Sequence, residues 1–526
     1  MEPRTTTGPS EVADVVIVGG GAAGCVVAGR LAAGSDREIV LLEAGSVADA
    51  RRSPMPGGAF AALNDEILHT DVTVPQPELG GRKIAVLTGK ALGGGSSVNM
   101  LAWFQGDPAD YDGWLAAGAE GWGWADVRPV FQRIEHNAAG AGEFHGAGGP
   151  MAIDFARDIE PGLLRFVAAG EQVGLPVSHD LNGKDRVGVG LSPTNIRNGA
   201  RHSVVDGYLT PVAHRPGLSV RGDSPVERIL IEDGRATGVR LADGTVIRAR
   251  EKVVLAAGAL KTPKLLMLSG VGPAEHLRAH GIDVVADSPG VGQNLHDHPM
   301  VPAVWQVHSG RTLLDAQDEQ SQEAYRLLGR GPLSAFPTVA AFFPPADGDG
   351  APEVQGLFYL IGLDGDLQPL DEPAVTVTVA LLTPRSRGTL RLASADPAAA
   401  PIVDPGYLTD PGDLPRLREG VRRVAELMAA PAARKVSGAR VFPAEIASDE
   451  ALDEWIRQNV QTQWHPCGTC RMGTDPLAVV TPRLAVHGVE NLMVADNSVM
   501  PAVTRGNTHA PAVLIGERAA EFILGG

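Results

Sequence analysis

The chain has 526 residues, of which 44% are hydrophobic and 20% are charged. This length exceeds what one ordinary hydrophobic core organises, so it indicates at least two domains, and the composition is typical of a globular enzyme. Acidic residues outnumber basic ones by 62 to 45, giving a net charge of −17, and no Lys/Arg run offsets this excess. We therefore exclude nucleic acid and anionic membranes as partners.

The cysteines and the N-terminal segment bear on the cellular compartment. Cys25, Cys467 and Cys470 are too few for a disulfide framework and fit a reducing compartment. Residues 1–13 are polar, without the apolar core of a signal peptide. No apolar stretch approaches the ~20 residues that span a bilayer. We expect a cytoplasmic protein without a membrane span, and the sequence does not indicate its oligomeric state.

The first predicted elements are a strand, a helix and a second strand. Residues 15–18 and 39–42 are short apolar runs without polar alternation, which is typical of strands buried on both faces. Residues 22–33 lie between them and have the pattern of a helix. Glycines separate the first strand from this helix.

Further along the chain, the pattern changes from strands with tight turns to a region with Pro/Gly punctuation. Residues 217–257 predict several short strands, with turns at Asp233-Gly234 and Asp243-Gly244. Residues 301–400 predict an antiparallel region that covers a substrate. Its strand candidates are residues 358–361 and 375–381, and helices are predicted at 413–428, 449–460 and 510–524.

A glycine fingerprint opens the first helix. Gly19, Gly21 and Gly24 satisfy G-x-G-x-x-G after a strand, and Glu43 follows near the expected spacing. Gly19 permits the tight turn, Gly21 lets the backbone approach a pyrophosphate, and Gly24 permits close helix–strand packing. Glu43 would accept hydrogen bonds from the ribose hydroxyls and would repel a 2′-phosphate, which disfavours NADP. The fingerprint alone leaves NAD and FAD open.

Two later segments carry a family resemblance. Residues 89–99 (GKALGGGSSVN) and 258–272 (GALKTPKLLMLSGVG) resemble the two signatures of the glucose–methanol–choline (GMC) oxidoreductase family. Further matches are residues 107–112, 292–299 and 465–473. The resemblance runs from the first strand to the final helix in the family's order. It implies an α/β fold with a Rossmann-like FAD-binding domain of GMC type, a second substrate domain built on an antiparallel sheet, and FAD rather than NAD.

The resemblance also implies a discontinuous division of the chain. The FAD-binding domain would comprise residues 1–157, 201–300 and 465–526, and the substrate-binding domain residues 158–200 and 301–464.

Carried over residue by residue, the resemblance gives expected FAD contacts. Ser96 and Asn99 would lie beside the flavin ring, and the Gly93-Gly94 backbone near the pyrophosphate. The expected contacts from later segments are the Val226 backbone at the adenine, Asp496 at the ribityl or pyrophosphate region, and the Ala510 N–H at the flavin carbonyl edge.

One departure from the family concerns how FAD is attached. Some members bind it covalently through a histidine just before the Asn, where this chain has Val98 before Asn99. Valine has no nucleophile, so we predict non-covalent FAD.

Two histidines occupy the family's catalytic positions. We assign His465 as the base that takes the hydroxyl proton while the hydride moves to flavin N5, because imidazole titrates near neutrality. His509 would hydrogen-bond the substrate oxygen, a position at which the family often has Asn. Trp464 either forms a pocket wall beside the cofactor or packs in the core.

Other motifs receive a structural interpretation. Cys467 and Cys470 have C-x-x-C spacing but lack a thioredoxin-like setting, so we expect packing. His296 and His298 flank Asp297, and no second cluster completes a metal site, so none is predicted. Pocket walls are expected from residues 59–68, 332–343 and 356–362.

The resulting functional prediction is FAD-dependent oxidation of a primary alcohol to an aldehyde. Aromatic and heteroaromatic alcohols are among the expected substrates. The electrons would pass to oxygen or another acceptor. The alternative within the same fold is a non-redox or light-driven flavoprotein, such as a hydroxynitrile lyase or a fatty-acid photodecarboxylase. An NAD-dependent dehydrogenase and a binding protein that keeps a cofactor only for its fold are two further classes. Choline-like, sugar, furan, benzyl and pyridoxine-like alcohols all stay open.

Overall fold

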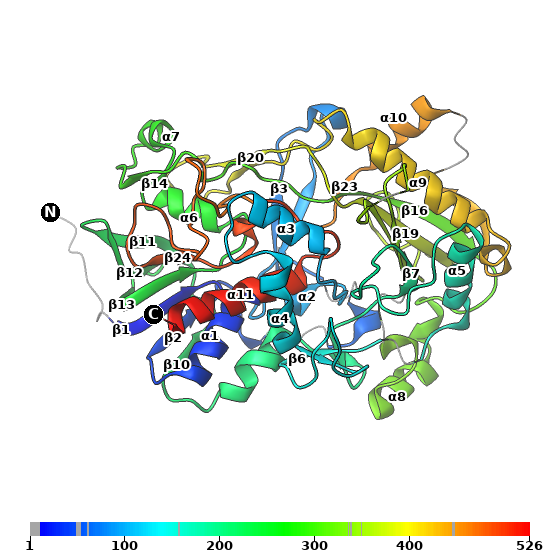
Figure 1. Cartoon of the computed structure of the whole chain (residues 1–526), viewed down its shortest axis with the longest axis horizontal. Coiled ribbons are helices and arrows are strands. Elements are labelled where there is room, and N and C mark those ends of the chain that lie inside the picture. Colours follow the sequence, from blue (N-terminus) through cyan, green and yellow to red (C-terminus); the bar gives the residue numbers. More distant parts are fainter. Residues whose placement is uncertain are drawn as a thin grey trace.

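The computed structural model shows a molecule built around two sheets (Figure 1). The structure describes residues 11–48, 54–59, 63–155, 158–334, 336, 339–348, 350–443 and 448–525. Parts of the expected pocket walls 59–68 and 332–343 lie outside these described residues.

The first sheet contains the predicted strand–helix–strand unit. β1 (Glu11–Val18) pairs in parallel with β2 (Ile39–Leu42) on one side and β13 (Val246–Leu255) on the other. Residues 15–18 and 39–42 are all buried, which explains why their apolar runs lack polar alternation. The order is β10 (Leu218–Arg221), β2, β1, β13, β12 (Arg235–Leu241) and β11 (Val226–Glu232), with β24 (Leu492–Val494) also paired to β13.

Two helices from opposite ends of the chain lie side by side against this sheet. Figure 1 shows α11 (His509–Leu524, red) beside α1 (Ala22–Gly34, blue). The approach is close at Gly516, where an added Cβ would lie 2.8 Å from the Ala23 carbonyl oxygen. This packing brings the start of α11, with His509, to the same part of the fold as the glycine turn.

The second sheet is antiparallel and forms the other half of the molecule. α5 (Pro161–Gln172) and α9 (Asp413–Ala429) pack on one face, against Phe358 and Val377. The opposite face carries Leu357 and Tyr359. The order is β22 (Ser437–Phe442), β16 (Pro299–Val307), β19 (Ala374–Leu381), β18 (Val354–Tyr359), β17 (Val339–Phe343) and β7 (Gly188–Leu191), with β23 (Gln461–Thr462) paired to β16.

Smaller elements connect and cover the two sheets. The helices are α3 (Pro108–Ala116), α4 (Trp124–Ile134), α6 (Thr262–Leu268), α7 (Ala274–Ala279), α8 (Glu319–Leu328) and α10 (Asp449–Asn459). The hairpin strands are β3 (Leu68–Val72), β4 (Ala85–Gly89), β20 (Thr389–Arg391) and β21 (Ile402–Asp404).

Most of the predicted elements are confirmed. The strand at 375–381 and the three C-terminal helices agree with β19, α9, α10 and α11 within a residue or two. The strand predicted at 358–361 instead begins earlier, because β18 pairs along Val354–Tyr359 with β17 and β19. Gly356 sits inside this strand, and glycine obscures a strand pattern in sequence.

The hydrophobic cores follow the two sheets. One core gathers side chains of the first sheet, α1 and α11, and a second gathers the antiparallel sheet with α5 and α9. The residue boundaries of the FAD-binding and substrate-binding domains stay predictions. Leu390 and Val403, inside the range predicted for the substrate domain, pack in the first core.

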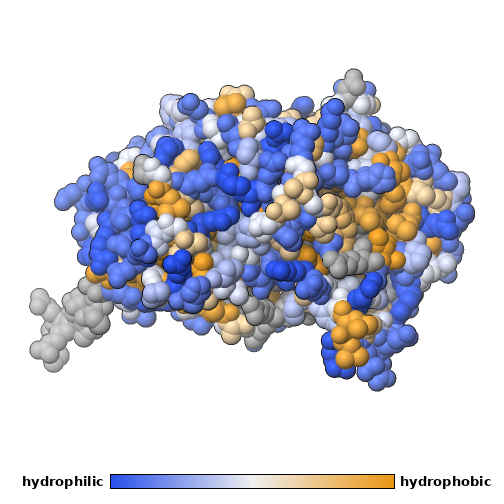
Figure 2. Space-filling view, turned by 60° about the horizontal axis from the view of Figure 1, so that its bottom comes forward, coloured by the Kyte–Doolittle hydropathy of each residue, from blue (hydrophilic) through white to orange (hydrophobic). Residues whose placement is uncertain are grey.

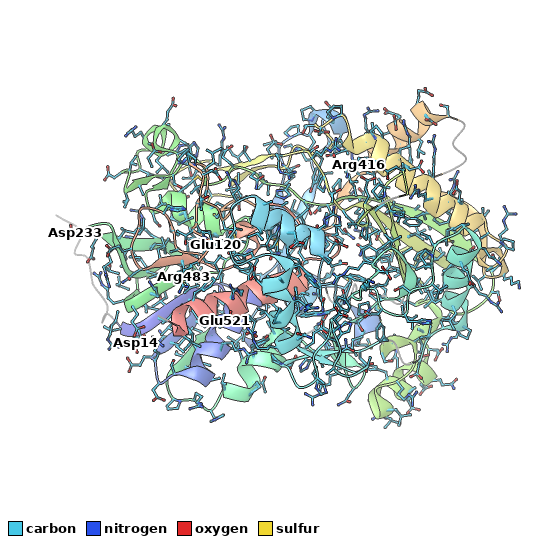
Figure 3. All side chains as sticks on the ribbon, in the orientation of Figure 1. Asp14, Glu120, Asp233, Arg416, Arg483 and Glu521 are labelled. Carbon is cyan, nitrogen blue, oxygen red and sulfur yellow. The ribbon has the colours of Figure 1, made fainter. Side chains whose placement is uncertain are left out.

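Several acidic residues at the surface form ion pairs with arginines. Figure 3 labels Glu521 on α11, which pairs with Arg518 at 2.7 Å. In Figure 2 most of the visible face is hydrophilic, and apolar groups gather on the half that holds the antiparallel sheet. Within the described part of the chain, no helix has the length and apolar character needed to cross a membrane.

Candidate active site

A cavity of about 640 Å³ is lined by residues of both halves of the molecule. The predicted site residues Gly19, Gly21, Glu43, Gly94, Ser96, Asn99, Val226, Trp464, His465, Asp496 and His509 all line it. Gly24, Gly93 and Ala510 belong to the same segments as these residues but do not line the cavity. The structure therefore collects residues that are up to 490 positions apart in sequence around one space, since Gly19 and His509 both line it.

The glycine turn has the geometry that its residue types require. Gly19 has φ of +104°, and an added Cβ would lie 2.4 Å from the Ala256 carbonyl oxygen. A Cβ on Gly24 would lie 2.0 Å from the Gly19 oxygen, whereas the nearest atom to one on Gly21 is 3.7 Å away. Gly19 and Gly24 are thus required by packing, and Gly21 leaves open space beside the start of α1 for a ligand.

Glu43 closes the turn with its carboxylate. Its Oε2 accepts the Gly20 N–H and its Oε1 the Gly45 N–H, each at 2.8 Å. Burial raises the pKa of Glu43 to about 7, although these two N–H groups oppose the shift. The carboxylate lines the cavity, and each oxygen has a second lone pair. The predicted role at the ribose hydroxyls stays a prediction.

The second glycine-rich segment touches the first. Gly94 has φ of +50°, and a Cβ there would lie 2.7 Å from the Gly21 Cα atom. α2 (Gly95–Val98) begins directly afterwards, and Ser96 Oγ donates to the Gly93 carbonyl at 2.8 Å. The two turns therefore form one backbone cradle against which a pyrophosphate fits.

A buried arginine that sequence reasoning missed fixes this cradle. Arg201 donates to the Ser96 carbonyl at 3.1 Å and to the Oδ1 and main-chain oxygen of Asn99, both at 2.7 Å. Burial lowers the pKa of Arg201 to about 9, so it remains cationic at neutral pH. Since Asn99 Oδ1 also accepts the Leu101 N–H, the amide nitrogen of Asn99 is turned away from these partners.

Asp496 ties the second signature segment to the end of the first sheet. Its Oδ2 accepts the Gly258 N–H at 2.9 Å and the Thr262 hydroxyl at 2.6 Å. Val226 opens β11 and lines the cavity. Ala510 is fully buried in the first turn of α11 and does not line the cavity. Around this turn the residues that line the cavity are Thr508, His509 and Ala512.

These residues fit a flavin dinucleotide. An added Cβ on Gly95 or Gly258 would meet nothing within 4 Å, so the cradle is open where a cofactor approaches. Among the described residues, Trp464 Nε1 and His509 Nε2 are buried without a hydrogen-bond partner, and both residues line the cavity. Buried polar atoms of this kind require partners, and the flavin ring offers both donors and acceptors.

His465 is held from three directions. Its main-chain N–H donates to Asp297 Oδ1 at 2.8 Å. Its Nδ1 lies 2.9 Å from Nδ1 of His298, and its Nε2 lies 3.3 Å from Nδ2 of Asn507. The ring is therefore fixed with Nε2 on the side of Asn507, another residue that lines the cavity.

The hydrogen bonds determine which nitrogen of His465 carries the hydrogen. His298 Nε2 contacts the Leu382 carbonyl at 3.1 Å, and because a carbonyl only accepts, this nitrogen donates. Burial lowers the pKa of His298 to about 3, so the ring is neutral and its Nδ1 accepts. His465 Nδ1 must then donate to it. His465 Nε2 is consequently left as the basic nitrogen.

Burial sets the charge state of the site. It holds the pKa of His465 well below 6.5, with the nearby His298 ring adding to the shift. Burial, followed by the Arg201 charge, lowers the pKa of His509 to about 3. Both imidazoles are thus neutral at pH 7, which is the form that a general base needs.

The partner of His465 Nε2 is Asn507, which sequence reasoning missed. His509 lies two positions further along and packs edge-on against Trp103, with ring centroids 5.2 Å apart. The signal was present, since the family's second position often holds Asn and the chain has Asn507 beside His509. His509 lines the cavity, and its predicted contact with the substrate oxygen stays a prediction.

Trp464 has a left-handed backbone, with φ of +58°. This conformation is uncommon for a bulky residue and concentrates at functional sites. The Trp464 N–H donates to Thr462 Oγ1 at 2.7 Å, which holds the turn that presents the neighbouring His465.

The two cysteines of the C-x-x-C segment are buried free thiols. Burial raises the pKa of both well above the usual value, so neither is a thiolate at neutral pH. Cys467 Sγ contacts His296 Nε2 at 3.5 Å, within the packing behind the site.

Comparisons with known proteins agree with this geometry. Family models for the N- and C-terminal parts of GMC oxidoreductases match residues 13–300 and 384–516. A similar curated protein is the oxygen-dependent choline dehydrogenase of Brucella suis biovar 1, 36% identical over 98% of this chain and 96% of the relative. That of Sinorhizobium fredii is 35% identical over the same shares.

Solved structures show the same fold. Pyridoxine 4-oxidase from Mesorbium loti superposes with a TM-score of 0.88 at 29% identity, covering 97% of this chain and 98% of that one. Formate oxidase superposes with a TM-score of 0.90 at 27% identity, covering 98% and 99%. The family models cover most of the chain, and its cradle fits the cofactor. The chain belongs to the GMC oxidoreductase family and is an FAD-dependent alcohol oxidoreductase.

Proposed function

We propose that this protein oxidises a primary alcohol to an aldehyde, with His465 Nε2 as the base that removes the hydroxyl proton. The observation that carries the proposal is the pair of contacts that His298 makes, with the Leu382 carbonyl and with His465 Nδ1, from which we infer that His465 Nε2 is unprotonated in the cavity wall. FAD, when bound, supplies the acceptor for the hydride that leaves the alcohol carbon.

The protein's contribution is to position the alcohol and to hold the proton. A hydroxyl that points at His465 Nε2 replaces or joins the contact from Asn507, whose amide then holds the substrate oxygen. A positioned base of this kind contributes a factor of about 10²–10⁴ in rate. Asn507 and His509 both line the cavity beside the base and stabilise negative charge on the oxygen as the proton leaves.

The environment of His465 favours the neutral ring that accepts the proton. Its low pKa keeps the base neutral before the reaction. After proton uptake the ring carries a positive charge, while Asp297 holds the main chain of the turn by accepting the His465 main-chain N–H and the Tyr407 hydroxyl. A positive charge at this position favours electron delivery to oxygen or to another acceptor.

The names of similar proteins support a hydroxyl substrate. The curated relatives are choline dehydrogenases, and a fungal aryl-alcohol oxidase superposes with a TM-score of 0.85 at 25% identity. Val98 supports non-covalent attachment of the cofactor, since it lies in α2 beside the cradle and has no nucleophilic atom.

The experiment is a panel of primary alcohols with the purified holoprotein, run once with oxygen and once with an artificial dye. Peroxide formation reports oxidase activity, and dye reduction without peroxide reports dehydrogenase activity. We expect turnover of at least one alcohol in one arm. Failure of a broad panel in both arms, with flavin bound, would favour a non-redox or light-driven flavoprotein instead.

A further inference from the structure

The cavity has two chemically different ends. We define the base end as its lining residues from 98–102, 463–466 and 507–512 together with Tyr359. These segments pack on one another: the Trp103 ring meets His509, and an added Cβ on Gly506 would lie 2.9 Å from Phe104 Cβ. Among the described residues of the base end, none carries a carboxylate.

The carboxylates that line the cavity lie outside the base end. They are Glu43, Asp71 and Asp496. Glu43 holds backbone N–H groups of the glycine turn, and Asp496 holds those of the second signature segment. Asp71 binds the Lys261 ammonium at 2.6 Å and 2.8 Å. Each of these three carboxylates is hydrogen-bonded or ion-paired to groups other than His465.

The acid closest to His465 is also turned away from the cavity. Asp297 Oδ1 accepts the His465 N–H at 2.8 Å, and its Oδ2 accepts the hydroxyls of Tyr407 and Thr462. It is 3% exposed and is not among the cavity-lining residues. Its oxygens are therefore already hydrogen-bonded to protein groups and do not face a ligand.

Positive charge, by contrast, is present or develops at the base end. Arg201 is buried against Asn99 and lowers the pKa of His509 by its charge. His465 gains a proton during the proposed reaction. A cationic substrate would therefore meet the Arg201 charge on binding and the additional charge of protonated His465 during turnover. Among the described residues no counter-ion faces it, which disfavours both its binding and its turnover.

A neutral amide lines the cavity close to the base in sequence. Gln463 lines the cavity two positions before His465 and is 6% exposed. Its Nε2 donates to Gln355 Oε1 at 3.2 Å, and Gln355 Nε2 donates to Asn507 Oδ1 at 3.4 Å. Within the described residues, its Oε1 has no hydrogen-bond partner. Gln463 thus belongs to the polar wall around the base and adds no charge to it.

We propose that the base end selects an uncharged alcohol and rejects a quaternary ammonium alcohol, and that Gln463 determines this preference. The inference rests on the proposed function and separates this chain from the substrate named for its curated relatives. Recognition of a quaternary ammonium uses a carboxylate together with aromatic faces. Among its described residues, the base end offers the aromatic rings of Tyr359 and Trp464 but not the acid.

Matched substrates test charge alone. Choline and 3,3-dimethylbutan-1-ol have nearly the same shape and differ by one positive charge, as do (1-methylpyridinium-3-yl)methanol and 3-methylbenzyl alcohol. We expect the neutral member of a pair to give kcat/KM on the order of 100-fold higher, as for unit charges about 5 Å apart at an effective dielectric constant of about 20. The readouts are anaerobic flavin reduction and steady-state turnover with the holoprotein.

The variant test uses two glutamines close in sequence. Gln463→Glu adds a carboxylate at the base end with little change in shape, and we expect the cation-to-neutral ratio of kcat/KM to rise at least tenfold. Gln461→Glu makes the same change at a residue that lies outside the lining and whose amide donates to the Gly365 carbonyl. It is the control and leaves the ratio unchanged.

The outcomes separate this inference from the proposed function. Equal or better turnover of the cationic alcohols by the wild-type protein overturns the inference and leaves alcohol oxidation standing. Flavin reduction by neither member of any pair, or by any other alcohol, overturns the proposed function and the inference with it. If Gln463→Glu does not fold, the comparison of paired substrates with the wild-type protein decides alone.

Discussion

The Nδ1 atoms of His298 and His465 lie 2.9 Å apart, in a contact that is buried on both sides. Only one of the two nitrogens can donate, and the Leu382 carbonyl at the far side of His298 decides which. A main-chain carbonyl therefore sets the direction of hydrogen bonding through His298 and leaves the basic nitrogen of His465 in the cavity wall.

His298 is a positioning residue, and its replacement tests this relationship. We expect His298→Leu to slow flavin reduction by about 10-fold to 100-fold at saturating alcohol. In this variant His465 Nδ1 loses its acceptor, so both neutral tautomers of the His465 ring become accessible. His298→Gln can donate to the Leu382 carbonyl and accept from His465, so it is expected to recover much of the rate. Equal rates for Leu and Gln variants would show that the ring serves packing only.

The pH dependence follows from the low pKa of His465. The base must be neutral, and its pKa lies well below 6.5, so flavin reduction is expected to be independent of pH from about 7 to 9 and to fall only on the acid side. The measurement is the rate constant of anaerobic flavin reduction at saturating alcohol across this range. A rise between about pH 7 and 9 would assign the essential base to another group.

Asn507 and His509 are distinguished by their contacts. Asn507 is at hydrogen-bond distance from His465 Nε2, whereas the His509 ring packs against Trp103. We expect Asn507→Ala to lower the rate of flavin reduction by about 100-fold to 1000-fold, the scale of one lost hydrogen bond to a developing oxyanion. His509→Asn, which keeps a side-chain donor, is the matched variant and should retain more of the rate. A larger loss in His509→Asn would reverse these roles.

His145 gives a stability effect that is separate from the active site. Although burial lowers it, hydrogen bonds to Asp180 and Glu135 raise the pKa of His145 to about 9. Because the folded-state pKa is raised from 6.5, the stabilisation is complete below pH 6.5 and is lost as the pH rises through 9. His145→Ala is expected to lower the free energy of unfolding by about 2 kcal/mol near pH 7 and by less near pH 10, measured by urea unfolding. An equal loss at both pH values would contradict this assignment.

Non-covalent attachment gives a direct chemical prediction. Val98 offers no nucleophile at the position where some family members carry a histidine. Acid precipitation is expected to release all of the yellow flavin into the supernatant. Colour that remains in the washed pellet would contradict the prediction.

Much of the first domain could be predicted from sequence because its signals are local. The apolar runs at residues 15–18 and 39–42 report burial on both faces, and Gly19, Gly24 and Glu43 report a turn whose geometry the structure confirms. β16 was missed because it begins with Pro299 and contains Pro302, and pairing with β19, 68 to 80 positions away, stabilises it nonetheless.

The site was predicted less completely for a physical reason. His465 was identified from its motif, but its partner His298 lies 167 positions earlier and Asn507 lies 42 positions later. Their roles arise only when the antiparallel sheet, the 463–466 turn and the start of α11 meet. Arg201 was missed for the same reason, since its hydrogen bonds go to Asn99 and Ser96, more than a hundred positions away.

The central claim is that His465 removes the alcohol proton while the hydride leaves. The most direct measurement is anaerobic stopped-flow bleaching of the bound flavin by an uncharged primary alcohol, in the wild-type protein and in His465→Ala. We predict rapid bleaching in the wild type and a rate about 10²–10⁴-fold lower in the variant, with flavin content unchanged. Bleaching of the variant at the wild-type rate would contradict the account.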